Sequence, residues 1–285
     1  MADAEVDPLT GRRVTIVESR QSRPNLPADE HCPFCPGGLE APEPYETRWF
    51  ENRWPPLPGG RAQVLLYSPD HDASMATLSP AQARAVVDMW ADRTRTLGAR
   101  ADVAYVLLFE NRGAEVGATI RHPHGQVYAY DEVPPAAMRE LTNLVCALCE
   151  EDPGNRLVTA RDGWRAWVPA LAAWPYELVV APERHVPDVP ALDDGERNAL
   201  ADILVDVIAA LDKHFDAETP LMMWIHQQPT DGGDWALAHL HAHITPIWRA
   251  PGVVRFVAAA ELGSDVMFNP ITPSDAAADL RSAQA

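Results

Sequence analysis

The sequence predicts an α+β protein, built as a tandem duplication of one strand-rich unit with an antiparallel sheet and flanking helices. The main observation is a Cys-x-x-Cys pair that occurs twice and is followed each time, 39 residues after its first cysteine (71 − 32 and 185 − 146), by a histidine. A helix, an apolar strand and a His-x-His sequence then follow in the same order. We therefore divide the chain into residues 1–135 and 136–285. The repeated residues are Cys32, Cys35 and His71 in the first half and Cys146, Cys149 and His185 in the second.

The first half is expected to contain one helix among several strands. Ser79 is a good helix N-cap and Pro80 suits the first turn, so an amphipathic helix should run from there to about Leu97. Apolar runs predict strands before and after it, and Asn111 to Gly113 should form a turn. The expected strands are residues 13–17, 63–67, 103–109 and about 122–130.

The second half repeats this order. Asp193 is an expected N-cap eight residues after His185, just as Ser79 lies eight residues after His71. Its helix should run to about Phe215, and an apolar strand should end near Ile225. The second His-x-His sequence, which ends at His243, continues with Ile-Thr-Pro instead of Gly-Gln. We therefore expect the chemistry in the first half and a scaffolding role for the second.

Composition excludes several classes of protein. The chain has 285 residues, of which 47% are hydrophobic, which suits one large domain or two small ones with a real core. A formal charge of −18 opposes non-specific binding to nucleic acid or to an anionic membrane. No apolar run resembles a signal peptide or a membrane span, so we expect a cytoplasmic protein.

The stretch from His122 to Gln126 is the candidate reactive site. A residue before proline adopts an extended conformation, so His122 and His124, two residues apart, can face one site. A neutral imidazole can bind a metal or attack as a nucleophile, so one ring can be anchored while the other reacts. Gly125 would let the backbone approach a ligand, and Gln126 would offer an amide to an oxyanion. The alternative is a turn with two surface histidines.

Each half also offers the donors of a closed tetrahedral zinc site, which would be structural rather than catalytic. In a reducing compartment a Cys-x-x-Cys pair suggests metal before disulfide, although redox pairs and buried cysteines share the spacing. Zinc on His122 would fix the backbone that aims His124. The expected ligand sets are Cys32, Cys35, His71 and His122 in the first half, and Cys146, Cys149, His185 and His241 in the second.

Taken together, these motifs resemble galactose-1-phosphate uridylyltransferases, a branch of the histidine-triad superfamily built from two such halves. The resemblance extends from Asp7 to about Asn269. The motifs that carry it are Asp7-Pro-Leu-Thr-Gly, Cys32-Pro-Phe-Cys, Ser68-Pro-Asp-His, Phe109-Glu-Asn-Arg-Gly, His122-Pro-His-Gly-Gln, Ala173-Trp-Pro-Tyr-Glu and Leu240-His-Ala-His.

This resemblance implies a double displacement, in which His124 takes the uridylyl group of UDP-glucose as a phosphoramidate and passes it to a second sugar 1-phosphate. It also implies a homodimer. By position, Gln126, Thr119 and Asn111 match phosphate-contacting or active-site residues of the family. Arg20 and Arg23 match arginines near the diphosphate, Asn52 and Trp54 fall where uridine is held, and Phe256 and Glu261 match an acceptor-sugar segment that the partner subunit supplies.

The sequence also departs from the family pattern. Ala259 and Ala260 stand where a glycine and often an aromatic residue are found, and Met267 stands at a glutamine position. A second hypothesis is therefore a related nucleotidyltransferase or phosphorylase with another nucleotide or acceptor, and a third is a zinc-stabilised nucleotide-binding protein. Some members carry iron on one glutamate and three histidines, for which Glu140, His226, His241 and His243 are the candidates here. His241 cannot serve both this set and the second cysteine set, and the repeated spacing of 39 residues favours the cysteine set.

Overall fold

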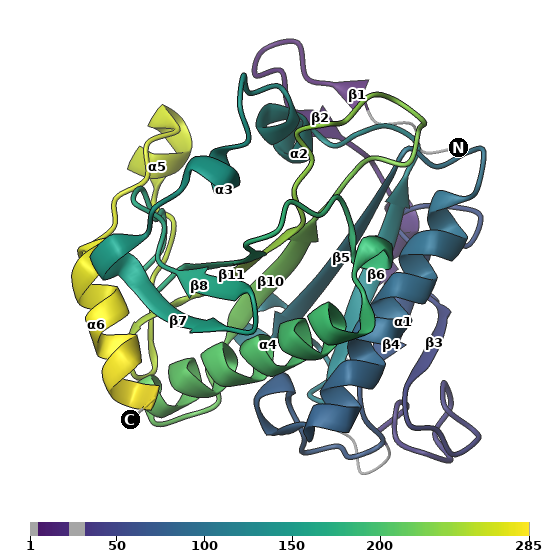
Figure 1. Ribbon diagram of the computed structural model, residues 1–285. Coiled ribbons are helices and arrows are strands. Elements are labelled where there is room, and N and C mark those ends of the chain that lie inside the picture. The colour runs from purple at the N-terminus through teal and green to yellow at the C-terminus, as the bar shows by residue number, and fades with distance from the viewer. Residues whose placement is uncertain (1–4, 23–31, 285) are drawn as a thin grey trace.

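The computed structural model describes residues 5–22 and 32–284. Its centre is a nine-stranded antiparallel sheet with the order β3-β4-β6-β5-β10-β11-β9-β8-β7. The long helices α1 and α4 lie side by side on one face of this sheet, and α6 packs beside α4 at the β7 end (Figure 1). The expected α+β fold with an antiparallel sheet and flanking helices is confirmed.

The two halves of the chain contribute to one sheet in a symmetric way. β5 and β10 pair at the centre, with Phe109 opposite Trp224. On either side follow β6 and β11, then β4 and β9, then β3 and β8. The strands of the sheet are β3 (Arg48–Glu51), β4 (Ala62–Leu66), β5 (Tyr105–Arg112), β6 (His124–Tyr130), β7 (Leu157–Arg161), β8 (Trp164–Trp167), β9 (Leu178–Pro182), β10 (Leu221–His226) and β11 (His241–Pro246).

Outside this sheet, the described residues form two short hairpins, six α-helices and five short 3-10 helices. The hairpins pair β1 (Glu5–Val6) with β2 (Arg13–Val14) and β12 (Trp248–Ala250) with β13 (Val253–Val254). The helices are α1 (Pro80–Gly98), α2 (Pro135–Leu141), α3 (Ala147–Glu150), α4 (Asp194–Phe215), α5 (Ala259–Ser264) and α6 (Pro273–Gln284). No helix in the described part of the chain is long and apolar enough to span a membrane.

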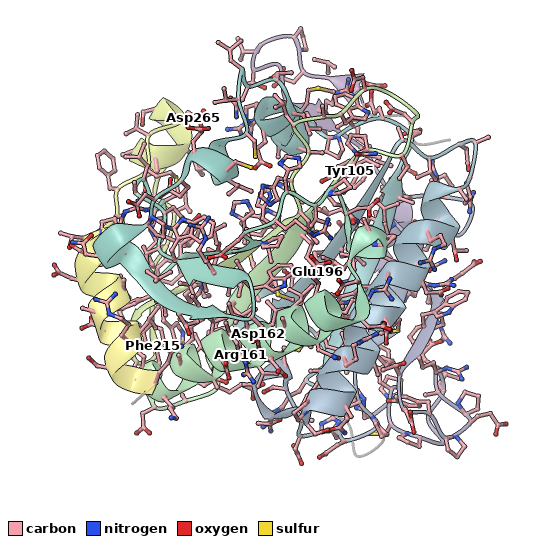
Figure 2. All side chains as sticks on the ribbon, in the orientation of Figure 1. Tyr105, Arg161, Asp162, Glu196, Phe215 and Asp265 are labelled. Atoms are coloured by element: carbon pink, nitrogen blue, oxygen red, sulfur yellow. The ribbon has the colours of Figure 1, made fainter. Side chains whose placement is uncertain are left out.

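Both long helices begin where their capping residues predict. The Ser79 side chain accepts from the backbone amide of Gln82, and Pro80 occupies the first turn of α1. The Asp193 side chain accepts from the backbone amide of Glu196 at 2.8 Å, which begins α4 in the same way. Glu196 and Phe215 mark the two ends of this helix (Figure 2). Each cap satisfies amides that the first turn leaves without an intrahelical partner.

The core lies between the sheet and these two helices. Alternate residues of β5 and β6 are buried against the helices, while the residues between them are partly exposed on the opposite face. Val106, Leu108 and Val127 belong to this core together with Trp90 of α1. Because successive side chains of a strand point to opposite faces, this burial leaves His124 and Gln126 on the face that the long helices do not cover.

Three local expectations differ from the structure. The expected strand at residues 13–17 shortens to the two residues of β2. Asn111 and Arg112 continue β5 instead of starting a turn, because β10 pairs with them, and the chain turns at Gly113, whose φ is 100°. β6 begins at His124, so His122 precedes the strand.

Candidate active site and metal clusters

His124 stands at the start of β6 with its imidazole oriented by the backbone. Its Nδ1 lies 2.7 Å from the carbonyl oxygen of His122. A carbonyl only accepts hydrogen bonds, so Nδ1 carries the proton and the ring lone pair is on Nε2. The ring also packs edge-on against Phe34, with 5.2 Å between centroids. His124 is therefore held in the tautomer that a nucleophile attacking through Nε2 requires.

A large pocket adjoins this histidine. It has a volume of about 1,320 Å³ and is lined by His124, the end of β5 and the loop from Gly113 to Pro123, with Asn111 and Thr119 in its wall. Three of the predicted residues, His124, Asn111 and Thr119, are thus brought together. A pocket of this size can hold a ligand larger than a single sugar.

Gln126 lies two residues further along the same face of β6, outside the lining of this pocket. Its Oε1 accepts hydrogen bonds from Asn52 Nδ2 and from the Tyr128 hydroxyl, each at 3.2 Å. Asn52 in turn accepts from the backbone amide of Trp54 at 2.9 Å. These bonds orient the amide so that the Gln126 NH₂ group is the end left to serve as a donor.

Gly125 is required for packing, a reason that differs from the expected approach of a ligand. A Cβ atom at this position would lie 2.0 Å from the Tyr67 hydroxyl and 3.0 Å from the carbonyl oxygen of Phe109. Tyr67 is buried beneath the strand against Trp90. The glycine therefore lets β6 pass directly over the Tyr67 ring.

Glu110 is a buried carboxyl group at the wall of the pocket. Its side chain is 5% exposed, and Oε2 has no hydrogen-bond partner. Burial raises the pKa of Glu110 to about 7, with Glu218 and Asp212 adding to the rise and the nearby Arg112 opposing it. At pH 6 the folded chain therefore holds this carboxyl mainly in its neutral form.

This shift predicts a pH-dependent stability difference between the wild type and Glu110→Gln. Between pH 4.5 and 7 the unfolded carboxyl ionises while the folded one stays protonated, so wild-type stability falls as pH rises. The full shift corresponds to about 3 kcal/mol. In urea unfolding at several pH values, the free energy of unfolding of Glu110→Gln should rise relative to that of the wild type by up to this amount between pH 4.5 and pH 8. A constant difference would show that the Glu110 pKa is not raised.

The first metal cluster joins Cys32, Cys35, His71 and His122, as the sequence predicts. Cys35 Sγ lies 3.6 Å from Nδ1 of both histidines. A tetrahedral ion with ordinary Zn–S and Zn–N bonds separates sulfur from nitrogen by about 3.6 Å, so the donors fit zinc. Burial lowers the pKa of His122 to about 4, which keeps the imidazole neutral, the form that binds metal.

His122 is also fixed from its other side. Its Nε2 lies 2.7 Å from the Ser68 carbonyl oxygen and 2.8 Å from the Tyr45 hydroxyl. The carbonyl requires a proton on Nε2, which leaves Nδ1 as the metal donor. Since the backbone oxygen of the same residue orients His124, the cluster and His124 share one rigid segment.

The second cysteine cluster requires a correction. Cys146, Cys149 and His185 come together as expected, but the fourth donor is His239, and His241 is not part of this set. His239 Nδ1 lies 3.3 Å from Cys146 Sγ and 3.5 Å from Cys149 Sγ, again a spacing that suits zinc. The predicted fourth ligand, His241, lies two residues further along the chain than the histidine that joins the cluster.

Strand geometry explains this register. His241 Nδ1 lies 2.7 Å from the carbonyl oxygen of His239, which repeats the contact between His124 and His122. His239 is therefore the counterpart of His122, and His241 is the counterpart of His124. The signal available in the sequence was a third histidine in alternation: residues 239, 241 and 243 are all histidine, and the first half has His122, His124 and Gln126.

His241 belongs to a third cluster instead, with Glu140, His226 and His243. Glu140 Oε2 lies 2.8 Å from His226 Nδ1 and 3.4 Å from His241 Nε2. Burial raises the pKa of Glu140, but hydrogen bonds from the three histidines outweigh burial and hold that pKa well below its usual range. A carboxylate facing three imidazoles suits a divalent transition metal. The two alternatives for His241 are thus resolved geometrically, because each cluster has its own four donors.

The remaining predicted residues lie elsewhere. Arg20 is in the short 3-10 helix Glu18–Ser22 and is not among the residues that line the pocket, and Arg23 lies outside the described residues. Phe256 is 78% exposed in the segment after β13. Glu261, on α5, is 6% exposed.

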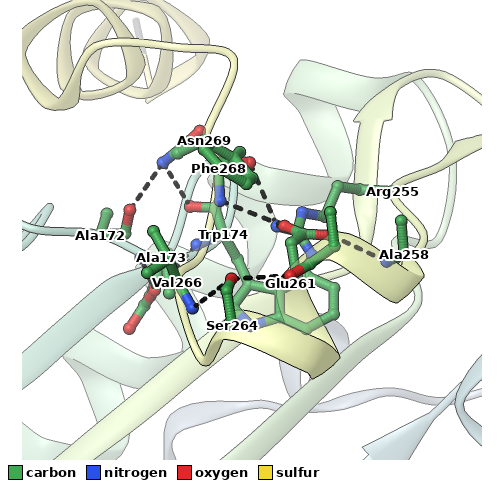
Figure 3. A network of polar contacts seen from close by, with 12 residues as sticks. Ala172, Ala173, Trp174, Arg255, Ala258, Glu261, Ser264, Val266, Phe268 and Asn269 are labelled. Atoms are coloured by element: carbon green, nitrogen blue, oxygen red, sulfur yellow. Dashed lines mark hydrogen bonds and ion pairs between the residues drawn. The ribbon is translucent and has the colours of Figure 1, made fainter.

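Glu261 forms hydrogen bonds and an ion pair within its own segment of the chain, which runs from Arg255 to Phe268 (Figure 3). Its Oε2 accepts from the backbone amide of Ala258 at 2.8 Å, and its Oε1 accepts from Phe268 at 3.1 Å and pairs with Arg255. The Arg255 guanidinium stacks over Trp174, 4.6 Å from the ring centroid. The carboxylate is thus occupied within one chain, and this network fixes the segment that presents Phe256.

The fold and the site define a protein of two like halves, with an oriented histidine in the first half and cysteine–histidine clusters in both. Family models for the N-terminal and C-terminal domains of galactose-1-phosphate uridyl transferase match residues 55–134 and 135–281. The chain belongs to the galactose-1-phosphate uridyl transferase family.

Known relatives match most or all of the chain. The galactose-1-phosphate uridylyltransferase of Thermotoga maritima is 34% identical, with 100% of this chain and 99% of the relative covered. The enzyme of that name from Streptomyces lividans is 38% identical over 87% of this chain and 78% of its own. A solved structure described as a uridylyltransferase superposes with a TM-score of 0.87 at 28% identity, covering 98% of this chain and 97% of that one.

Proposed function

We propose that this protein transfers a uridylyl group between UDP-glucose and galactose 1-phosphate through a covalent uridylyl-histidine at His124. The observation that carries the proposal is the contact of 2.7 Å between His124 Nδ1 and the His122 carbonyl oxygen, which directs the lone pair of Nε2 away from the backbone. Family membership and the relatives' names support the substrates.

In the first step, His124 Nε2 attacks the α-phosphorus of UDP-glucose. The bond from this phosphorus to the bridging oxygen breaks, and glucose 1-phosphate leaves with the electron pair. The Nδ1 proton stays on the imidazole, and the His122 carbonyl stabilises the positive charge that develops on the ring. In the second step, a phosphate oxygen of galactose 1-phosphate attacks the same phosphorus and the P–N bond breaks, which restores neutral His124 and yields UDP-galactose.

The side chains around His124 have supporting roles in this proposal. The Gln126 amide, oriented by Asn52 and Tyr128, donates to a phosphoryl oxygen, and Asn111 and Thr119 contact phosphate from the pocket wall. Trp54 and Asn52 hold uridine, and Arg20 and Arg23 approach the diphosphate. Their types and positions match the family, and the assignments are proposals residue by residue.

We also propose zinc in both cysteine clusters and a divalent transition metal in the third. Zinc at Cys32, Cys35, His71 and His122 would supply a fixed anchor for the segment that orients His124. All four cysteines are unpaired, so none is removed from metal binding by a disulfide. Unpaired cysteines also support a reducing, cytoplasmic location. The boundary between the two family models supports a division into halves near residue 135.

A homodimer is proposed from one exposed apolar surface. Phe256, Leu262, Val266 and Phe268 are between 53% and 78% exposed on the segment from Arg255 to Phe268. Figure 3 shows Val266 and Phe268 of this group. Exposed apolar residues grouped on one rigid segment are typical of an interface between proteins. A second copy of the chain would cover them and bring Phe256 to its partner's pocket.

The contacts of Glu261 support a second candidate function. Because both of its carboxylate oxygens accept hydrogen bonds within its own segment, this side chain is poorly placed to bind an acceptor sugar as well. This favours the alternative of a related nucleotidyltransferase or phosphorylase with another acceptor or nucleotide. Both candidates keep the covalent chemistry of His124.

Label exchange tests the proposed function. Purified protein should move radiolabel from glucose 1-phosphate into UDP-glucose without any acceptor, and should form UDP-galactose when galactose 1-phosphate is added. Exchange without transfer to galactose 1-phosphate would support the second candidate. If neither exchange nor transfer occurs with UDP-, ADP- or GDP-sugars, the chain would be a zinc-stabilised nucleotide-binding protein instead.

A further inference from the structure

The charges around the pocket pose a problem for an anionic ligand. The chain carries a net charge of −18, and Glu110, Glu115 and Glu218 all line the pocket. The arginines in its described lining are Arg112 and Arg121. Within this described lining, these two arginines are the permanently charged cations that can offset the surrounding carboxylates next to a bound phosphate.

Arg112 is already committed to the fold. Its side chain is 8% exposed and donates to both carboxylate oxygens of Asp212, at 2.5 and 3.1 Å, and to the Thr219 carbonyl at 2.8 Å. A buried, bidentate arginine of this kind would lose its partners if it turned toward a ligand, which would leave a buried charge on Asp212. Arg112 therefore holds β5 against the end of α4.

Arg121 is in the opposite situation. Its side chain is 64% exposed, and its two contacts are ion pairs at 3.6 Å to Asp72 and 3.5 Å to Glu218, both longer than charge-assisted hydrogen bonds. Exposed pairs of this kind contribute little to the stability of the fold. The guanidinium can leave both carboxylates at little cost.

The backbone of Arg121 is nevertheless well fixed. It directly precedes His122, which is buried and anchored by Ser68, Tyr45 and the first metal cluster. Two residues separate Arg121 from His124, so their Cα atoms lie within about 11 Å. A long side chain on a fixed backbone at this distance can reach a phosphate bound next to His124.

We propose that Arg121 is a substrate-binding residue that holds the phosphate of the sugar 1-phosphate, the product of the first step and the acceptor of the second. On binding, the guanidinium exchanges its long contacts with Asp72 and Glu218 for a bidentate contact with the phosphate. In the empty pocket these two carboxylates keep the guanidinium at the wall. This inference rests on the proposed function, because it names the residue that selects for an anionic acceptor.

The test uses uridylylated protein, prepared with UDP-glucose and freed of small molecules, and follows its discharge by glucose 1-phosphate. Arg121→Gln should raise the half-saturating concentration of glucose 1-phosphate at least about 10-fold, with a smaller change in the maximal rate. Arg121→Lys should recover part of the loss, since it keeps the charge without the planar fork. Asp72→Asn should lower the half-saturating concentration by weakening the resting contact.

Arg161→Gln is the matched control. Arg161 is a surface arginine at the end of β7, paired with Asp202 and Asp206 of α4, and it does not line the pocket (Figure 2). The control should leave discharge unchanged. An Arg121→Gln protein with wild-type half-saturation would overturn the inference.

Failure of the proposed function would look different. In that case the wild type would form no uridylyl adduct, and Arg121 would be tested by calorimetric binding of glucose 1-phosphate to the wild type and to Arg121→Gln. Weaker binding by the variant would still support an anion-binding Arg121. Equal binding by the two proteins would refute it.

Discussion

Replacement of His124 by alanine is expected to lower kcat for uridylyl transfer by at least about 10⁴-fold, because the covalent intermediate loses the atom to which it is bonded. The side chain is partly exposed at the start of β6, so its removal leaves the core intact. Steady-state transfer from UDP-glucose to galactose 1-phosphate measures the effect, and thermal unfolding confirms that the variant is folded.

A histidine outside the site provides the control for this variant. His214 lies near the end of α4, with its ring 4.3 Å from that of Tyr176, and His214→Gln should retain turnover within about twofold of the wild type. Residual activity of His124→Ala above about 1% of the wild type would contradict a covalent role for His124.

Loss of the first metal cluster should reduce both stability and activity. Cys35→Ser removes the sulfur that lies 3.6 Å from both cluster histidines, so we expect one fewer metal ion per chain and a free energy of unfolding lower by at least about 3 kcal/mol. Turnover per folded chain should fall as well, because the segment that orients His124 is no longer anchored. Elemental analysis, urea unfolding and transfer assays measure the three effects.

Cys149→Ser separates these effects, since it alters the second cluster at a distance from the reactive histidine. It should also lose one metal ion per chain, while the fall in turnover per folded chain should be the smaller of the two. Full metal content in purified Cys35→Ser would show that the first cluster is not a metal site. An equal loss of turnover in both variants would remove the link between His122 anchoring and catalysis.

Much of the site could be predicted because its residues lie close together in sequence or recur at a fixed spacing. His122 and His124 are separated only by Pro123, and the extended backbone before a proline already places them on one segment. The repeated spacing of 39 residues correctly predicted that His71 and His185 lie next to their cysteine pairs. Helix capping fixed the starts of α1 and α4 for the same local reason.

The errors come from features that depend on tertiary contacts. Counting from Cys146 across loops of unequal length selected His241, whereas the contact between a ring nitrogen and a backbone carbonyl two residues earlier identifies His239 as the fourth member of the candidate metal cluster. The role of Gly125 depends on Tyr67, which is remote in sequence. The closed network around Glu261 likewise required the three-dimensional structure, since a motif match alone suggested contact with sugar.

The central claim, a covalent uridylyl-histidine at His124, is tested most directly by intact-protein mass spectrometry after brief incubation with UDP-glucose alone. We predict a mass increase of one uridylyl group that maps to His124, is absent in His124→Ala and disappears when a sugar 1-phosphate acceptor is added. An active protein that never carries this adduct, or carries it on another residue, would contradict the account.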